Sequence, residues 1–441
     1  MFKNIANAFK VADIRKRLLF TMLMVLLVRF GCQIATPGVN IEYIRALFES
    51  MNNSSFNFFN VITGNSFATM SVFALNISPY ITASIVVQLL TIAIPRLEEL
   101  SKEGEEGKKT INKITRYLTV ALALIQSVSM AIGFGSGYLN NYTWYNVALV
   151  AIVMTSGSTA LMWIGERISE KGVGNCISIL LLVNILSGLP GDFGILYNTF
   201  VKGKNVTVAI LSAILILALI FALVVFTVYL QDGERRVAVQ YAKKVQGRKM
   251  VGGQSSNIPI KVNTAGVIPV IFASSLLSLP AMIAAFAGKD ISQPKTFGGH
   301  VIKALSQNYW CNPKEPIYSV GLLIYLFLLV VFAYFYTSIT FNPNEVANNM
   351  KKNGGFVPGI RPGKPTSEYL NRILNYIVFI GVCGLAIIAV IPIVLTGLTG
   401  VGSSLCFFGT SLIIIVGVIL ETLKQIESMM TVRSYKGFLN D

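Results

Sequence analysis

Residues 342–366 read NPNEVANNMKKNGGFVPGIRPGKPT, and this stretch separates two long apolar runs of the chain. Proline fixes φ and glycine permits positive φ, so the prolines and glycines of this stretch favour a defined irregular shape over a helix. Arg361 lies between Gly359 and Pro362, close to Lys364. The stretch therefore predicts a shaped basic loop at a membrane surface, suited to docking a large soluble partner.

The whole chain has the composition of a polytopic membrane protein. Its 441 residues are 54% hydrophobic and only 13% charged, with a mean hydropathy of +0.65. Soluble domains carry about 25% charged residues. No cleavable signal peptide is evident, because the first apolar run contains Arg29 and has no small-residue cleavage site followed by a soluble domain. We therefore expect the first run to be a retained span.

Ten apolar runs are candidate spans, since a helix needs about 20 apolar residues to cross the hydrocarbon core. They are approximately Leu18–Ala35, Ile77–Ile94, Tyr117–Gly135, Val147–Ile164, Ile177–Leu189, Val206–Leu230, Gly266–Phe286, Ile317–Ser338, Ile373–Val394 and Ser403–Leu420. The fifth run is short for a span. The pattern predicts an all-α membrane protein with ten transmembrane helices.

The loop charges give the orientation. Lys and Arg total 36 against 20 Asp and Glu. Twenty-eight of the basic residues fall on the side of the N-terminus when the ten spans alternate, seven fall on the other side, and Arg29 lies inside the first span. Cytoplasmic loops carry the excess of Lys and Arg, so both termini are expected in the cytoplasm.

Two of the expected cytoplasmic loops are long and basic, at about 231–262 and 342–368. The first could form two short arms around a turn at residues 246–247. Its charges could serve only as a topology signal on a solvated face. Alternatively, the loop could be a basic hairpin that binds ribosomal RNA phosphates or an acidic protein surface.

The chain lacks the usual signatures of metal and nucleotide chemistry. Its five cysteines are scattered with no CxxC pair, and its single histidine, His300, falls in a polar stretch that we expect to be a solvated loop. GIRPGKPT resembles a phosphate loop only superficially, because Pro358 and Pro365 stand where that motif needs Gly and Ser or Thr. We expect no catalytic constellation, no metal and no cofactor. Energy for directed work must then come from a partner.

The apolar runs contain few ionisable residues, and Arg29 is the clearest. Ion-coupled transporters usually bury acids or histidines on the ion path, so a secondary solute transporter is disfavoured but stays open. Ile81 and Ile85 could face lipid, or could line a constriction that excludes water and ions. Residues 59–70 are too polar to span and too apolar for an open loop, so they should pack inside the protein or line a cavity.

Several motifs taken together resemble the SecY/Sec61-alpha family of protein-conducting channel subunits, over nearly the whole chain. They are SPYITASIVVQLL (78–90), ERISEKGVGNCISI (166–179), RRVAVQYAKKVQGRK (235–249), IPIKVNTAGVIPVIFASSLL (258–277), the opening stretch and GTSLIIIVGVILET (409–422). Cys176 stands where the family motif has glycine, and Leu181 where a relative has isoleucine. We attach no function to Cys176.

The resemblance implies two inverted pseudo-symmetric five-helix halves, residues 1–190 and 191–441, with an external plug segment at about 57–70. It implies an apolar pore ring of Ile81, Ile85, Leu181, Ile185, Ile271 and Ile414. The plug includes Phe58, Asn60, Gly64, Phe67 and Met70. A lateral gate between spans two and seven includes Ser84, Gln88, Ser274 and Ser275. Docking residues in the two basic loops are Arg235, Arg236, Arg248, Lys249, Lys351, Lys352, Arg361 and Lys364.

The implied function is passage of unfolded secretory proteins across the bacterial plasma membrane, and insertion of membrane proteins into it. The implied partners are the small membrane subunits SecE and SecG, the motor ATPase SecA, the ribosome, signal peptides, unfolded preproteins and membrane lipid. The main rival is a secondary solute transporter with inverted repeats. A second rival, a membrane enzyme, lacks a visible catalytic constellation.

Overall fold

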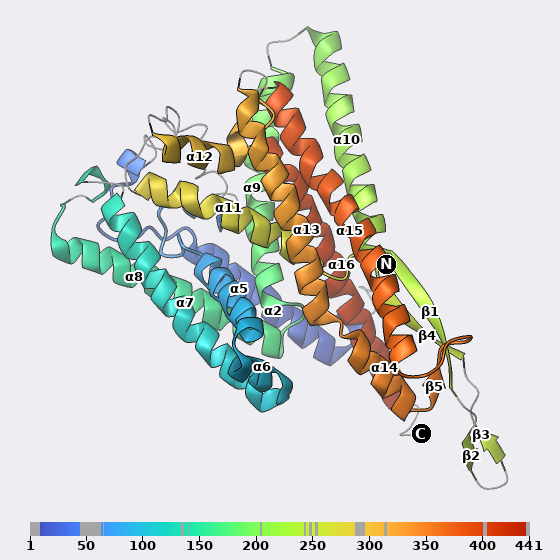
Figure 1. The fold of residues 1–441 in the computed structure, drawn as a ribbon. Coiled ribbons are helices and arrows are strands. Elements are labelled where there is room, and N and C mark those ends of the chain that lie inside the picture. Colours follow the sequence, from blue (N-terminus) through green and yellow to red (C-terminus); the bar gives the residue numbers. More distant parts are fainter. Residues whose placement is uncertain are drawn as a thin grey trace.

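The structure is a computed structural model. It describes residues 9–44, 63–64, 66–133, 136–139, 141–202, 205–241, 244–246, 249–251, 255–286, 296–312, 315–399 and 404–437. The described chain is a bundle of long helices with a small β region at its lower end (Figure 1). The predicted all-α membrane fold is confirmed for the helical bundle, and the β region is an addition that the all-α prediction did not include.

The first part of the bundle comprises α2 (Ala12–Gly31), α5 (Ser78–Ala93), α6 (Pro95–Lys102), α7 (Glu105–Gly133), α8 (Trp144–Lys171) and α9 (Cys176–Phe200), with a short 3-10 turn η1 (Ser136–Tyr138). The second part comprises α10 (Val206–Asp232), α11 (Ile268–Phe286), α12 (Phe297–Leu305), α13 (Val320–Thr340), α14 (Pro343–Lys352), α15 (Lys364–Thr399) and α16 (Ser404–Gly437), with the 3-10 turns η2 (Gln307–Tyr309) and η3 (Pro316–Ser319).

A helix covers most of each of the ten predicted spans. Within the described residues, six helices are long and apolar enough to cross a membrane, or seven if the bent pair α5 and α6 forms one span. Helix α2 carries several charges, among them Arg15, Lys16, Arg17 and Arg29, and the apolar part of α11, Ile268–Ala281, is short. The count of ten spans therefore stays a prediction.

Several predicted span boundaries are wrong. Helix α9 is 25 residues long and continues through Pro190, so the fifth span is not short. Membrane helices tolerate proline where neighbouring groups satisfy the freed backbone. Helix α7 begins at Glu105, so much of the predicted loop before the third span is helical. At Pro95 the chain bends by 106° between α5 and α6, because proline lacks an N–H and restricts the residue before it.

The opening stretch is only partly irregular. Residues 343–352 form α14, so the prediction of an irregular shape was wrong for this part. The Asn342 side chain accepts from the backbone N–H groups of Asn344 and Glu345, and Pro343 occupies the first turn, where its missing N–H costs nothing. The irregular part runs from Asn353 to Gly363, where Gly354, Gly359 and Gly363 have φ values of 71°, 82° and 106°.

The two long basic loops meet in one sheet. β1 (Glu234–Tyr241) pairs antiparallel with β4 (Ser255–Lys261) on one side and with β5 (Gly355–Phe356) on the other. β2 (Lys244–Gln246) and β3 (Lys249–Val251) pair with Gln246 opposite Lys249. The predicted pair of arms is confirmed, but the turn was misplaced, because Gln246 is a paired residue of β2. The pairing of β1 with β5 was not predicted, because nothing local in either loop specifies it.

Apolar clusters divide the core. One cluster is built from residues 237–413 and a second from residues 39–154, so each lies within one predicted half. A third cluster contains residues of α2, α5, α8 and α9 together with Ile414 and Val418 of α16. This third cluster therefore joins the two parts of the chain at the centre of the bundle.

Candidate functional site

The six predicted pore-ring residues belong to this central cluster. Ile81, Leu181, Ile185 and Ile414 are buried, and Ile85 and Ile271 are partly buried against them. They come from four helices, α5, α9, α11 and α16. Branched aliphatic side chains offer no hydrogen bonds, so a constriction built from them sheds water and ions. The arrangement can close the centre of the bundle without a polar site.

Of the plug residues that the structure describes, Gly64 lies beside α9 next to the ring, whereas Phe67 and Met70 lie in another cluster. A Cβ on Gly64 would come within 2.9 Å of the Asn184 carbonyl oxygen in α9 and 2.9 Å of Arg29 Nη1. Phe67 and Met70 are buried in the core of residues 39–154, where Tyr138 Oη donates to Met70 Sδ. Packing of this segment inside the protein is thus confirmed for these residues. Phe58 and Asn60 lie outside the described residues.

The predicted gate residues lie on two separate helices. Gln88 Nε2 donates to Ser84 Oγ at 3.3 Å along α5. Ser274 is buried on α11, and the Ser275 carbonyl accepts from Ser278 Oγ at 2.9 Å. Helix α7 packs against both α5 and α11. The described residues contain no hydrogen bond between the two pairs of predicted gate residues.

The lower end of the molecule carries the predicted docking residues. Arg235 and Arg236 are exposed on β1, and Arg236 Nη2 pairs with Glu234 Oε1 at 2.7 Å. Exposed Lys351 and Lys352 occupy the last turn of α14, where their charges suit the negative end of the helix dipole. Because β5 pairs with β1, the basic residues of the first loop and those of the opening stretch belong to one structural unit.

Arg361 and Lys364 are exposed at the end of the irregular stretch. Thr366 Oγ1 donates to the Arg361 carbonyl at 2.8 Å, which fixes the backbone that presents the guanidinium. Lys249 lies on β3, with its side chain outside the described residues, and Arg248 lies outside them altogether. The structure therefore brings together six of the eight predicted docking residues.

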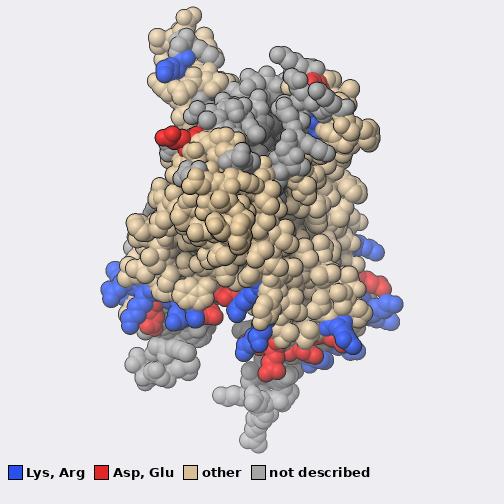
Figure 2. Space-filling view, turned by 90° about the vertical axis from the view of Figure 1, so that its left-hand side faces the viewer, with Lys and Arg blue, Asp and Glu red and all other residues tan. Residues whose placement is uncertain are grey.

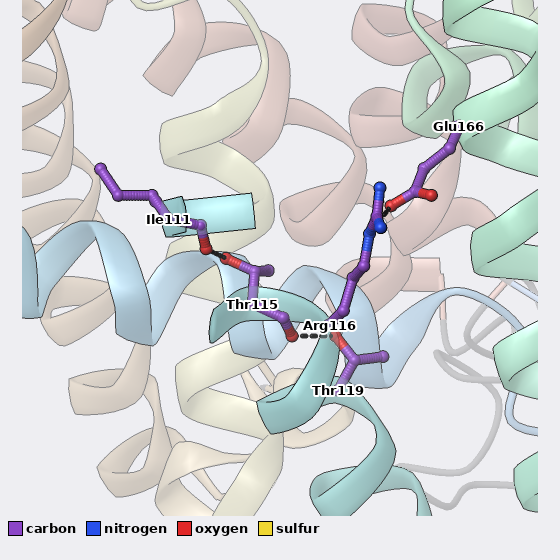
Figure 3. Close-up of polar contacts among 5 residues, drawn as sticks. All are labelled: Ile111, Thr115, Arg116, Thr119 and Glu166. Carbon is purple, nitrogen blue, oxygen red and sulfur yellow. Dashed lines mark hydrogen bonds and ion pairs between the residues drawn. The ribbon is translucent and has the colours of Figure 1, made fainter. Parts of the chain in front are cut away.

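Other charges gather at the same end. In Figure 2, Lys and Arg line the lower rim of the visible face, below a broad uncharged band. Figure 3 shows Arg116 of α7 reaching Glu166 of α8, with Arg116 Nε 2.6 Å from Glu166 Oε1. On the same helix, Thr115 Oγ1 donates to the Ile111 carbonyl at 3.0 Å and Thr119 Oγ1 to the Thr115 carbonyl at 2.7 Å. Both threonine hydroxyls bond within α7, so Arg116 is the residue among these five that links α7 to α8.

Comparisons with known proteins now decide the family. The SecY family model matches residues 71–423. The chain belongs to the SecY family. It is 39% identical over 445 residues to the protein translocase subunit SecY of Halalkalibacterium halodurans, and 39% identical over 448 residues to that of Bacillus subtilis, with 100% of each chain covered in both cases.

Solved structures share the fold. A structure described as "The structure of a protein conducting channel" aligns over 94% of this chain and 92% of its own, with a TM-score of 0.60 and 18% identity. The channel in "Sec61 in the Canine ribosome-channel complex from the endoplasmic reticulum" covers the same shares, with a TM-score of 0.59 and 17% identity. The SecY-family architecture therefore extends to residues on either side of the matched model.

Two polar residues near the centre were missed by sequence reasoning. Asn184 lies on α9 between the ring residues Leu181 and Ile185, is fully buried, and has no hydrogen-bond partner for its side-chain amide within the described residues. Ser187 Oγ donates to the Asn184 carbonyl at 2.7 Å and lies 3.5 Å from the Gly64 carbonyl oxygen. Arg29 Nη1 also lies 3.5 Å from that oxygen. A polar residue inside an apolar span was the available signal.

The remaining candidates for site chemistry have ordinary surroundings. A Cβ on Gly165 would lie 2.4 Å from Cys176 Sγ, so Cys176 fills the contact between α8 and α9. His300 lies in α12 rather than in a loop, exposed, with Nδ1 2.9 Å from Tyr318 Oη. The described residues contain no cluster of His, Cys, Asp and Glu that could hold a metal ion.

Proposed function

We propose that this chain is the channel subunit of a protein translocase, which passes unfolded secretory proteins across a membrane and inserts membrane proteins into it. The observation that carries the proposal is the central cluster, where six branched aliphatic side chains from both parts of the chain meet. Such a ring can fit around an extended polypeptide without selecting a side chain, and it excludes water when empty. The names of the SecY-family relatives support the same function.

The clamshell mechanism follows from this assignment. The two halves, residues 1–190 and 191–441, part at the ring, and the segment at about 57–70 leaves the external side of the ring. Signal sequences bind between α5 and α11, beside Ser84, Gln88, Ser274 and Ser275. Helix α7 packs against both of these helices, and Ser274 is buried on α11.

The driving force comes from partners at the basic end. Arg235, Arg236, Lys351, Arg361 and Lys364 contribute to the docking surface, which receives the motor ATPase SecA or the translating ribosome. Arginine pairs with phosphate and carboxylate in a bidentate manner, which suits an RNA or an acidic protein surface. A relative of this fold is described in a ribosome–channel complex.

SecE and SecG complete the membrane complex. The complex lies in the bacterial plasma membrane, and both termini of this chain lie in the cytoplasm. The chain itself performs no enzymatic step.

Reconstitution tests the proposal against a solute transporter. The purified chain with its small subunits, placed in proteoliposomes with SecA and ATP, should protect a labelled precursor from external protease. Dissipating the ion gradient should leave this ATP-dependent protection measurable. Saturable uptake of a small solute, without precursor protection, would overturn the channel assignment in favour of the transporter.

A further inference from the structure

A hollow groove lies between the lower ends of α13 and α15, beside the start of α14. Its volume is about 210 Å³, and its lining includes Tyr334 and Ser338 of α13, Asn342, and Asn371 and Asn375 of α15. A second, shallow and open hollow on α15, of about 340 Å³, shares Asn371 and Asn375 with it. The two hollows form one continuous surface feature, which we term the α13–α15 groove.

The α13–α15 groove lies at the level where the spans become charged. Helix α13 is apolar over most of its length and carries Thr337, Ser338 and Thr340 at its end, close to the groove. Helix α15 carries Lys364, Glu368 and Arg372 before its apolar part begins. In a chain that spans a membrane, this boundary coincides with the headgroup layer, where tyrosines such as Tyr334 and Tyr376 are enriched. A ligand in the groove would therefore meet lipid headgroups rather than bulk water.

Each wall of the groove changes from polar to apolar toward the membrane centre. On α15, positions 371, 375, 379, 383 and 387 share one face, since residues four apart are neighbours on a helix. After the two asparagines this face carries Phe379 and Ile387, which are 57% and 49% exposed. On α13, Ser338 and Tyr334 are followed by exposed Val331 and Phe327. The groove therefore matches a ligand with a polar head and apolar tails.

The polar end of the groove carries both signs of charge. Glu368 and Arg372 both line the second hollow and are exposed, one helical turn apart. Neither has an ion-pair partner among the described residues. A guanidinium binds phosphate well, and a carboxylate accepts hydrogen bonds from an ammonium group. These two charges complement a headgroup that contains both a phosphate and a primary ammonium.

We propose that the α13–α15 groove binds an ethanolamine phospholipid. Its phosphate lies against Arg372 and accepts from the side-chain amides of Asn371 and Asn375, its ammonium donates to Glu368, and its acyl chains follow Phe379 and Val331. An anionic phospholipid without an ammonium group would meet repulsion from Glu368. The inference rests only on the membrane-spanning part of the proposed function, and not on protein conduction.

Photocrosslinking in nanodiscs tests this site. The chain with its small subunits is placed in phosphatidylcholine nanodiscs that contain a few per cent of either a photoreactive phosphatidylethanolamine or a photoreactive phosphatidylglycerol. Crosslinked peptides are identified by mass spectrometry. We expect crosslinks from the ethanolamine lipid in residues 327–342 and 371–387, about fivefold above those from the glycerol lipid.

Three variants separate the contributions of the two charges. Glu368→Gln should reduce the ethanolamine crosslink to the level of the glycerol lipid. Arg372→Gln should reduce both crosslinks about fivefold. Arg167→Gln is the matched control. Arg167 lies on α8, near the end of that helix, with a partly exposed side chain that pairs with Glu170 at 2.9 Å, away from the groove. This control should leave both yields unchanged.

Other outcomes overturn the proposal. Equal labelling of the groove and of the exposed faces of α7 and α10 would indicate non-specific lipid contact. A preference for the glycerol lipid would overturn the ethanolamine assignment, and yields unaffected by both variants would overturn the site. Precursor translocation is measured separately on the same preparations, so an active channel without groove labelling would refute the lipid site alone.

Discussion

Ile271 and Ile283 lie on the same helix, α11, in opposite surroundings. Ile271 packs against the central cluster, whereas Ile283 is 64% exposed. Replacing Ile271 by Gly removes side-chain packing worth about 2 kcal/mol from the ring and leaves space for water. We expect a higher resting ion conductance for Ile271→Gly in planar bilayers. Ile283→Gly, which has the same cost in helix propensity of about 1 kcal/mol, should not leak. Equal conductance of the two variants would contradict the seal.

Arg361 tests the docking surface. Its side chain is exposed while its carbonyl is held by Thr366, so a substitution there should change the charge and little else. Arg361→Glu should lower SecA-driven precursor translocation at least about tenfold, because truncating or reversing a charge in an interface costs about 2–5 kcal/mol. Membrane insertion of the chain itself should persist.

The matched control is Lys171→Glu, which reverses an exposed charge on the last residue of α8. It should translocate normally. Equal activity of Arg361→Glu and the unmodified chain would refute a role for Arg361, whereas equal loss in both variants would indicate only a general charge effect.

For single residues, the sequence is a good guide to apolar positions and a poor guide to polar contacts. The ring residues could be placed because their family motifs lie in well-defined apolar runs. Asn184 and Ser187 stand out in the sequence as polar residues inside an apolar span, but their contact with the Gly64 region, more than a hundred residues away in the chain, could not be predicted. Such contacts leave no local pattern.

Among the elements, β1 has the most contacts that could not be predicted. Val237 and Val239 point into the core while Ala238 between them is exposed, which is the alternation of a strand with one buried face. The strand pairs with β4 of its own loop and with β5 from the opening stretch. It therefore couples the two basic loops mechanically.

Val239→Asp should uncouple these loops. The side chain is fully buried in the cluster of residues 237–413, and an unpaired carboxylate there would cost at least about 3 kcal/mol. We expect faster hydrogen exchange in both β4 and β5. Ala238→Asp places the same charge on the exposed face and should leave exchange unchanged. Unchanged exchange in β5 of Val239→Asp would show that the opening stretch is held independently of β1.

The helices themselves were predictable because continuous apolar runs identify them without tertiary information. Their ends were not. The Asn342–Pro343–Asn344–Glu345 start of α14 has the signature of a helix cap, yet the glycines and prolines that follow it suggested an irregular loop throughout. The fifth apolar run was predicted to be short, ending at Leu189, but helix α9 continues through Pro190 to Phe200.

On the scale of the whole molecule, the two parts of the chain are joined at two levels. The central cluster joins them at the ring. At the lower end, the turn between α8 and α9 contacts a helix from each part of the chain. The Val173 N–H donates to Thr21 Oγ1 of α2 at 3.1 Å. The Gly174 N–H donates to Gln425 Oε1 of α16 at 2.5 Å. Ile14, Val173 and Ile426 pack beside these bonds. A separation of the two predicted halves would have to break this second contact as well as the central cluster.

The orientation of the molecule can be tested at Cys311, which lies between η2 and η3 in the connection from α12 to α13. Helix α12 lies at the end opposite to the β region (Figure 1). The positive-inside rule places this end outside the cytoplasm. A membrane-impermeant maleimide added to spheroplasts should therefore label Cys311, and the same reagent added to inverted vesicles should not. Burial raises the pKa of the Cys311 thiol. The reactive thiolate then forms only at higher pH, so the labelling rate should still be rising where an ordinary exposed thiol has reached its plateau. Cys311→Ser should abolish the signal, while labelling from the inverted side would reverse the assigned topology.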